Sequence, residues 1–230
     1  KKGEVIGFIG SNGAGKSTVL SMISRLIPKD TGEIYLDHNE VKAWRSNELA
    51  KKLSILRQSN EINVQITVKE LVEFGRFPYT KGKLTTKDQK IVQESLEHLG
   101  LEEIADQSID TLSGGQLQRA YIAMVLAQDT DYILLDEPLN NLDMNFAVQI
   151  MQILKNLVQK IGKTIVIVLH DINFAASYAD EIIAMKDGKL FTQGTQGTTQ
   201  EMIKKDVLDE LYEMDIRICE IEGRRFCLYF

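Results

Sequence analysis

Cysteine, proline and long apolar runs are all scarce in this sequence of 230 residues. Two cysteines, Cys219 and Cys227, are too few for a disulfide framework, and the three histidines are too scattered to form a metal-ligand pattern with them. Three prolines and the absence of any low-complexity tract argue against a long linker. The longest clean apolar run, residues 164–169, is far shorter than the roughly 20 residues of a membrane-spanning helix, so we expect no bilayer crossing.

The sequence also has fewer basic than acidic residues: 27 Lys and Arg against 33 Asp and Glu, which gives a net charge of −6. Proteins that bind nucleic acid usually carry a basic stripe, since phosphate neutralisation dominates their affinity. We therefore expect no nucleic-acid partner. The chain begins without Met and moves directly into an apolar run, so we expect no signal peptide and a native protein that extends upstream of Lys1.

Short apolar runs alternate with amphipathic stretches along the chain, which predicts an α/β core. Strands are expected at residues 4–9, 32–36, 53–56, 132–135, 164–169, 182–185 and 189–192, and in a final hairpin formed by 216–221 and 225–229. Helices are expected at residues 17–26, across much of 68–127, between the strands at 132–135 and 164–169, and at 202–212. This pattern predicts a core from residues 1–58 and 129–194, a helical insert at 59–128, and a C-terminal helix and hairpin at 195–230.

Residues 10–17, Gly-Ser-Asn-Gly-Ala-Gly-Lys-Ser, match the pattern G-x-x-x-x-G-K-[ST] in full, between a predicted strand and a predicted helix. Glycines let the backbone curl so that successive N–H groups point at phosphate oxygens, and the helix N-terminus adds a favourable dipole. Lys16 can reach the β- and γ-phosphates, and Ser17 can hold Mg²⁺. An ordinary Gly-rich turn would not explain why Lys16-Ser17 directly follows the last glycine of the pattern. The predicted phosphate-binding residues are Gly10, Ser11, Asn12, Gly13, Ala14, Gly15, Lys16, Ser17 and Thr18.

Polar residues follow three further predicted strands, at the end where α/β sheets bind ligands. Asp136 is expected to hold Mg²⁺, and Glu137 to polarise the attacking water as general base. Gln58 is expected to contact Mg²⁺ or the water, and His170 to assist catalysis. Each of these residues alone could be a solvated strand end or a structural residue. The neighbouring phosphate-binding residues 10–18, here called the phosphate cradle, favour the catalytic interpretation.

A second candidate anion site lies at Leu112-Ser113-Gly114-Gly115-Gln116, directly before a predicted helix. Two glycines beside a serine at a helix N-terminus suit an anion. A plain N-cap explains Ser113 well but explains the glycine pair and Gln116 poorly.

These segments together resemble the ATP-binding subunit of ABC transporters, in the family's order and over nearly the whole chain. Residues 10–17 are similar to the Walker A loop, Gln58 to the Q-loop glutamine, 112–116 to the LSGGQ signature, 132–137 to Walker B, 141–143 to the D-loop and His170 to the switch histidine. The resemblance implies an α/β P-loop NTPase of the ABC ATPase type, with a RecA-like core, an inserted α-helical subdomain that carries the signature, and a small C-terminal α+β tail.

The same resemblance implies ATP and Mg²⁺ as cofactors and a head-to-tail homodimer with two ATP molecules between the subunits. Ser113, Gly114, Gly115 and Gln116 of one subunit would close over the nucleotide of the other. The aromatic residue that stacks on adenine in the family is missing from this sequence, which starts too close to Gly10 to include it.

Residues 70–79, Glu-Leu-Val-Glu-Phe-Gly-Arg-Phe-Pro-Tyr, resemble a segment of iron-siderophore, haem and vitamin B12 importers, as do residues 139–143. The resemblance implies a peripheral subunit at the cytoplasmic face of the cell membrane that energises import, with ferric siderophore as the preferred cargo. An integral membrane permease would dock near Gln58–Tyr79 and would link the subunit indirectly to a substrate-binding protein.

Two alternatives remain at this point. Gly75–Pro78 could be a simple helix terminator and turn, and the chain could be a soluble ABC ATPase of iron–sulfur cluster assembly or of another non-transport process. A DNA-acting member is disfavoured because no sustained heptads lie between the Walker A loop and the signature. A non-hydrolysing subunit is disfavoured because every catalytic position is filled.

Overall fold

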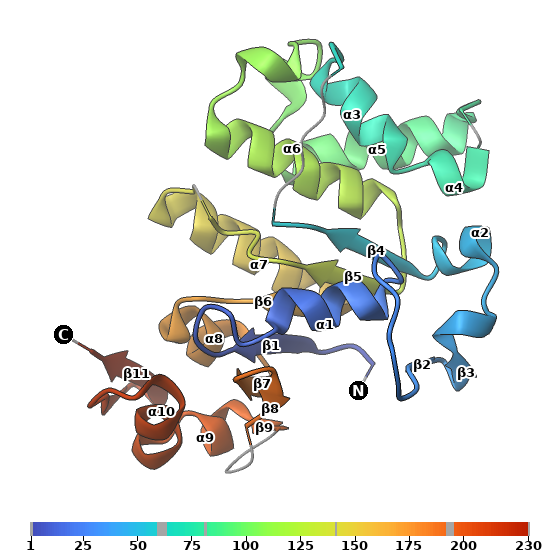
Figure 1. The fold of residues 1–230 in the computed structure, drawn as a ribbon. Helices are drawn as coiled ribbons and strands as arrows, with labels where there is room; N and C mark the ends of the chain where they lie inside the picture. The colour runs from blue at the N-terminus through green and yellow to red at the C-terminus, as the bar shows by residue number, and fades with distance from the viewer. Residues whose placement is uncertain (1, 59–63, 81, 141, 192–195, 230) are drawn as a thin grey trace.

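The computed structural model describes residues 2–58, 64–80, 82–140, 142–191 and 196–229, and its centre is a mixed sheet (Figure 1). Within these residues the strand order is β4-β5-β6-β1-β7-β8, with β9 beside β7. The strands are β1 Val5–Ile9, β4 Leu53–Leu56, β5 Tyr132–Leu135, β6 Thr164–Val168, β7 Glu181–Lys186, β8 Lys189–Leu190 and β9 Gln196–Thr198. β4, β5, β6, β1 and β7 run parallel, whereas β8 and β9 pair antiparallel with β7. The carboxyl ends of β4, β5, β6 and β1 therefore meet at one edge.

Helices cover both faces of the sheet because alternate residues of each strand point to opposite sides. In β5, Ile133 belongs to the same buried cluster as Leu154 of α7, whereas Leu134 belongs to a second cluster with Leu20 of α1. α1 and α7 thus lie on opposite faces. The helices are α1 Lys16–Ile23, α2 Ser46–Leu49, α3 Val68–Phe74, α4 Phe77–Thr80, α5 Thr86–His98, α6 Gly114–Ala127, α7 Met144–Ile161, α8 Ile172–Tyr178, α9 Thr199–Met202 and α10 Lys205–Tyr212.

The helices α3 to α6 form a separate layer beyond the β4 side of the sheet (Figure 1). Their start points are set locally, since Thr67, Thr85 and Ser113 each form a capping box at the N-terminus of α3, α5 and α6. The hydrophobic cluster that fills the interior of this layer continues into the core beneath β5. The helical insert expected from the sequence is therefore a set of packed helices joined to the sheet by a common core.

The chain ends in a tail at the far side of the sheet from α3–α6 (Figure 1). It consists of α9, α10 and a hairpin of β10 Arg217–Ile221 and β11 Arg224–Leu228. The helix expected over 202–212 is observed as α10 from Lys205 to Tyr212, but its expected start was wrong, because α9 ends at Met202 and the chain breaks before Lys205. The Arg225 guanidinium donates to the carbonyl oxygens of Gln200 and Ile203, so this side chain occupies backbone acceptors that a longer helix would use.

Two small elements complete the fold. The hairpin of β2 Tyr35–Leu36 and β3 Asn39–Glu40 follows α1, and its turn includes Asp37 and His38. None of the described helices combines the length and the apolar composition that a bilayer span requires. We propose 1–58 with 129–194, 59–128 and 195–230 as the three units; of these bounds, residues 1, 59, 194, 195 and 230 lie outside the described part of the chain.

Candidate functional site

The loop between β1 and α1 is built from backbone conformations that favour glycine. Gly10 has a φ of 139°, and a Cβ there would lie 2.0 Å from the carbonyl oxygen of Met185. Gly15, with a φ of 93°, precedes α1 and gives it no side-chain cap. The first amides of α1 are therefore left without a side-chain acceptor at a helix N-terminus, which is an arrangement suited to an anion.

Lys16 is the buried cation of the loop, with a residue exposure of 4%. Its Nζ donates to the carbonyl oxygens of Gly10 and Ser11, at 2.9 Å each. Burial lowers the pKa of Lys16, and the negative charges of Glu137 and Asp136 oppose this shift. Two neutral carbonyl oxygens thus hold the ammonium group at the base of the loop, in a position from which it can bind a phosphate.

Asp136 follows β5 and reaches across the edge of the sheet to the loop. Its Oδ1 accepts a hydrogen bond of 2.9 Å from the Ser17 hydroxyl, although β6 separates β5 from β1. Burial raises the pKa of the Asp136 carboxyl, and the Ser17 bond opposes that change. Two of the three predicted metal ligands, Ser17 and Asp136, therefore lie together.

This pair supplies the oxygen donors that Mg²⁺ prefers, a hydroxyl and a carboxylate. Among the described residues no group of three or more His, Cys, Asp or Glu side chains could hold a metal ion without help. The donor set therefore fits a cation that also takes oxygens from a bound phosphate group, as Mg²⁺ does at nucleotide sites.

Glu137 lies at the centre of a polar cluster formed after three parallel strands. Its Oε2 accepts from Gln58 Nε2 at 2.7 Å and from Asn140 Nδ2 at 2.8 Å, and its Oε1 lies 2.6 Å from His170 Nε2. The Glu137 side chain is 8% exposed. These contacts fix the orientation of the carboxylate, as a general base requires.

The Glu137 backbone is in the left-handed region, with a φ of 53°. For a residue with a Cβ this conformation costs about 1 kcal/mol, and such strain is one of the features that gather at active sites. No sequence pattern predicted this conformation. Asn140 was also missed as a site residue, although a polar residue three positions after the acid was a signal that could have been weighed.

The loop and the polar cluster line one cavity of about 480 Å³, a size typical of ligand sites. Its lining residues are Asn12, Gly13, Ala14, Gly15, Lys16, Ser17, Thr18, Gln58, Glu137, Asn140 and His170. Gly10, Ser11 and Asp136 do not line it, but they contact Lys16 and Ser17, which do. The structure thus brings the sequence-predicted residues of the loop and of the three strand ends to one place.

The second candidate anion site does not lie in this cavity. Ser113 caps α6, its Oγ accepting from the Gln116 amide, while its own amide donates to Gln116 Oε1. Ser113 and Gly114 are exposed, and Gly115 and Gln116 are half-buried. Within one copy of the chain, residues 113–116 therefore form a surface helix terminus that is separate from the cavity.

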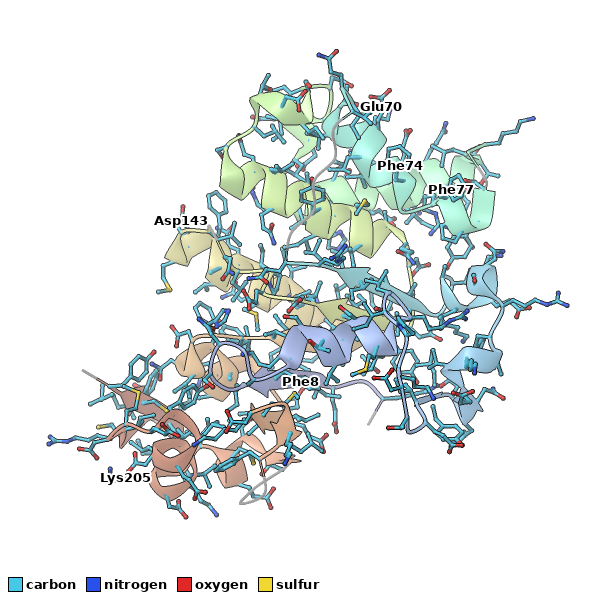
Figure 2. The ribbon with its side chains drawn as sticks, viewed as in Figure 1. Phe8, Glu70, Phe74, Phe77, Asp143 and Lys205 are labelled. Atoms are coloured by element: carbon cyan, nitrogen blue, oxygen red, sulfur yellow. The ribbon has the colours of Figure 1, made fainter. Side chains whose placement is uncertain are left out.

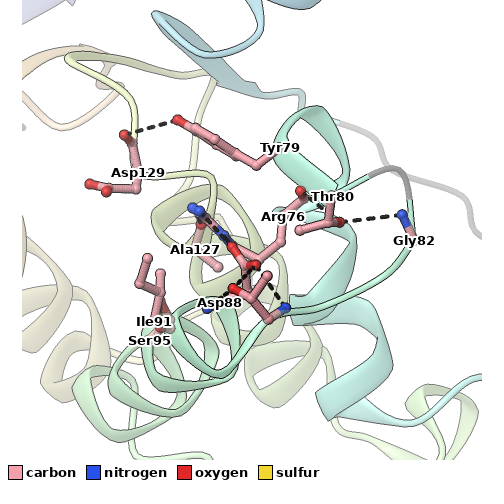
Figure 3. A network of polar contacts seen from close by, with 10 residues as sticks. Arg76, Tyr79, Thr80, Gly82, Asp88, Ile91, Ser95, Ala127 and Asp129 are labelled. Carbon is pink, nitrogen blue, oxygen red and sulfur yellow. Dashed lines mark hydrogen bonds and ion pairs between the residues drawn. The ribbon is translucent and has the colours of Figure 1, made fainter.

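The segment that resembles the siderophore importers is held by a buried ion pair (Figure 3). Arg76 donates from Nε to Asp88 Oδ1 at 3.0 Å, with a second contact of 2.9 Å from NH2, and donates from NH1 to the Ala127 carbonyl at 2.7 Å. The neighbouring aromatic side chains of Phe74 and Phe77 are 53% and 58% exposed (Figure 2). The segment is thus rigidly seated on α5 and α6 and presents an apolar surface.

Gly75 allows the end of α3 to lie very close to the backbone of α6. A Cβ on Gly75 would lie 2.2 Å from the carbonyl oxygen of Met124 on α6. The end of α3 can therefore approach the α6 backbone only without a side chain. Gly75 and Arg76 do more than terminate a helix: together they fix the segment against α6.

Comparisons with known proteins agree with this geometry. The sequence model of the family described as ABC transporter matches residues 1–140. The chain is 56% identical over its whole length, and over 90% of the relative, to the petrobactin import ATP-binding protein YclP of Bacillus subtilis (strain 168). It is 49% identical, over 92% of the chain and 83% of the relative, to the petrobactin import ATP-binding protein FatE of Bacillus anthracis.

A solved structure is also similar. The ATP-binding cassette MJ0796, in a dimeric post-hydrolysis state bound to ADP and Pi, superposes with a TM-score of 0.76 at 36% identity. The match covers 86% of this chain and 87% of that one. The fold is therefore that of an ATP-binding cassette, as the motif order predicted.

Proposed function

The chain belongs to the ABC transporter family, and from this premise we propose that it hydrolyses ATP at the cytoplasmic face of a membrane to energise import of a ferric siderophore. The enzymatic part is supported by one observation above others. Lys16, the Ser17–Asp136 pair and the oriented Glu137 carboxylate converge on the cavity formed by the loop after β1. The cargo is supported by the two petrobactin import ATP-binding proteins, whose similarity extends over all or nearly all of this chain.

The chemistry follows from the positions of these side chains. The loop amides and Lys16 would bind the phosphate tail and stabilise the charge that develops on the transferred phosphoryl group. Ser17 and Asp136 would hold Mg²⁺, which neutralises phosphate charge when bound. Glu137 would accept a proton from the attacking water, with its orientation fixed by Gln58 and His170.

Gln58 has two candidate roles, as ligand to the metal and as partner of the base. Its amide nitrogen donates to Glu137 in this structure, which supports the second role. The proposed metal role would use the other atom of the same amide, its carbonyl oxygen. The two roles are therefore chemically compatible.

A second copy of the chain would complete the site. Residues 113–116 are far enough from the cavity to line none of it, yet they lie at the exposed N-terminus of the 14-residue α6. The similar cassette MJ0796 is a dimer in two solved structures. A head-to-tail dimer would place this terminus against the phosphate of the partner's nucleotide, where its amides and dipole favour negative charge.

The permease would dock on the surface of residues 58–79. Phe74 and Phe77 are large exposed apolar side chains on neighbouring helices (Figure 2), and exposed apolar clusters commonly mark interaction sites. An amphipathic cytoplasmic helix of the permease is the occupant we propose. Residues 59–63 of this surface lie outside the described residues.

Two measurements test the proposal. ATP hydrolysis by the purified chain should require Mg²⁺ and rise more steeply than linearly with protein concentration, because the complete site needs two copies. Affinity purification from membranes should recover a polytopic permease, together with a ferric siderophore-binding protein. Recovery of soluble iron–sulfur scaffold proteins instead would overturn the import assignment, and absence of hydrolysis would overturn the enzymatic one.

A further inference from the structure

The C-terminal tail touches the phosphate loop directly. The Gly10 amide donates a hydrogen bond of 3.2 Å to the hydroxyl of Tyr212, the last residue of α10, across a sequence separation of 202 residues. The carbonyl of the same glycine accepts from Lys16 Nζ at 2.9 Å. The loop is therefore held on either side of the Gly10 Cα, by the tail on one side and by the phosphate-binding lysine on the other.

Tyr212 is well placed to hold the loop because α10 is itself fixed. Val207, Leu208 and Leu211 are buried on its inner face. Beyond its end, Glu213 pairs with Lys186 of β7 at 2.8 Å, and Lys186 also donates to the carbonyl of Glu210. The hydroxyl is therefore presented from a packed helix attached to the strand next to β1.

The environment of Tyr212 keeps its hydroxyl neutral. Burial is the main cause that raises the pKa of Tyr212. The oxygen that accepts from Gly10 is therefore an uncharged phenol oxygen at any pH at which the protein works.

Gly10 is a position where the loop cannot accommodate a side chain. A Cβ there would lie 2.0 Å from the Met185 carbonyl, and a second contact with the same sheet edge comes from the Gly188 amide, which donates to the Ala14 carbonyl at 3.2 Å. The first residue of the cradle is thus wedged between β7 and α10. The direction in which the chain leaves β1 and enters the cradle depends on these contacts.

We propose that Tyr212 is a positioning residue for the phosphate loop, whose hydroxyl presets the Gly10 peptide so that the loop amides are aligned before a phosphate tail arrives. The inference rests on the proposed ATP-binding function. Losing the hydroxyl leaves a half-buried amide without its partner and loosens the empty loop, so it should weaken phosphate binding more than it affects the chemical step.

The experiment compares Tyr212→Phe with Tyr35→Phe in the full chain. Tyr35 loses an equivalent hydroxyl, one that donates to Glu33 on the exposed β2 hairpin and lies outside the cavity. Dissociation constants for ATP and for inorganic tripolyphosphate are measured, with kcat determined at saturating ATP. We expect Tyr212→Phe to raise both dissociation constants by about three- to tenfold and to leave kcat within about twofold, whereas Tyr35→Phe changes neither.

A third variant separates the hydroxyl from the attachment of the tail. Glu213→Gln removes the exposed ion pair with Lys186 but keeps the Tyr212 hydroxyl, so it should leave both dissociation constants unchanged. Equal affinities in Tyr212→Phe and wild type would overturn the proposal, as would a fall in kcat with unchanged affinity. If wild type itself bound neither ATP nor tripolyphosphate, the proposed function would fail instead. Should Tyr212→Phe be poorly folded, an equal loss of affinity in Glu213→Gln would likewise overturn a specific role of the hydroxyl.

Discussion

Replacing Arg76 with Met should destabilise the protein strongly without touching the nucleotide cavity. Arg76 is 3% exposed and Asp88 5%, and three short contacts join the guanidinium to Asp88 and to the Ala127 carbonyl (Figure 3). Removing the cation leaves a buried carboxylate whose remaining hydrogen bonds come from Thr85. Breaking a buried pair in this way typically costs about 3–5 kcal/mol of unfolding free energy.

Urea unfolding followed by circular dichroism measures this cost. With a slope near 3 kcal/mol per molar, the midpoint should fall by about 1–2 M. Lys90→Met on α5, the helix of Asp88, is the matched control, because Lys90 and Glu94 form an exposed pair whose side chains are 77% and 50% exposed. That pair should contribute no more than about 0.5 kcal/mol.

A double variant identifies the mechanism. Arg76→Met combined with Asp88→Asn removes both charges but keeps a side-chain oxygen that can accept from Thr85, so much of the lost stability should return. If Arg76→Met cost no more than Lys90→Met, the buried pair would not carry the stability assigned to it. If the double variant were as unstable as the single one, the loss would come from packing and not from an unpaired charge.

The remaining predictions concern the site and its dependence on pH. Lys16→Ala should lower ATP hydrolysis about 100-fold or more, and an unchanged rate would contradict the cradle assignment. Glu137→Gln should lower turnover by about 10²–10⁴-fold and accumulate an ATP-bound dimer on gel filtration, so near-normal turnover would remove Glu137 from the role of base. Ser113→Arg should bind ATP normally yet fail to hydrolyse it, and undiminished hydrolysis would argue against a shared site. Hydrogen bonds from Thr85, followed by Arg76, hold the pKa of Asp88 below its usual value. The ionised Asp88 therefore stabilises the folded state at pH values above its unfolded pKa, about 4, and this contribution should be lost as pH falls through its lower folded pKa. The acid-unfolding curve of Asp88→Asn should lack this loss of stability.

Buried strands with polar ends were the part of the fold that the sequence predicted most closely. The bounds predicted for β4 and β5 agree with Leu53–Leu56 and Tyr132–Leu135 in the structure. Both are short apolar runs that pair side by side in the parallel sheet, and each ends where a polar residue begins. The site was predictable for the same reason, since residues at the ends of parallel strands must meet at one edge.

Features that depend on contacts between distant segments were not predictable. The break after α9 comes from a guanidinium more than twenty residues away, and Gly75 is required by a carbonyl of α6. Neither contact leaves a periodic pattern in the sequence. The first depends on one long-range side chain, and the second on the missing side chain of a glycine that lies close to another backbone. The sequence signalled a turn at Gly75 without its cause, and it signalled no break after Met202, where a continuous helix was expected.

The tail shows most clearly what local patterns leave out. Its helix α10 carries an ordinary amphipathic pattern, and Leu208 and Leu211 are buried on one face. The same pattern treats Tyr212 as one more residue at a helix end, although its hydroxyl meets the first glycine of the phosphate cradle. Because that hydrogen bond requires α10 to stay packed, loss of the buried contacts of Leu208 and Leu211 should weaken phosphate binding, whereas loss of the exposed Glu213–Lys186 pair should not. Residues 196–229 therefore belong energetically to the nucleotide site, even though they supply none of the residues that line it.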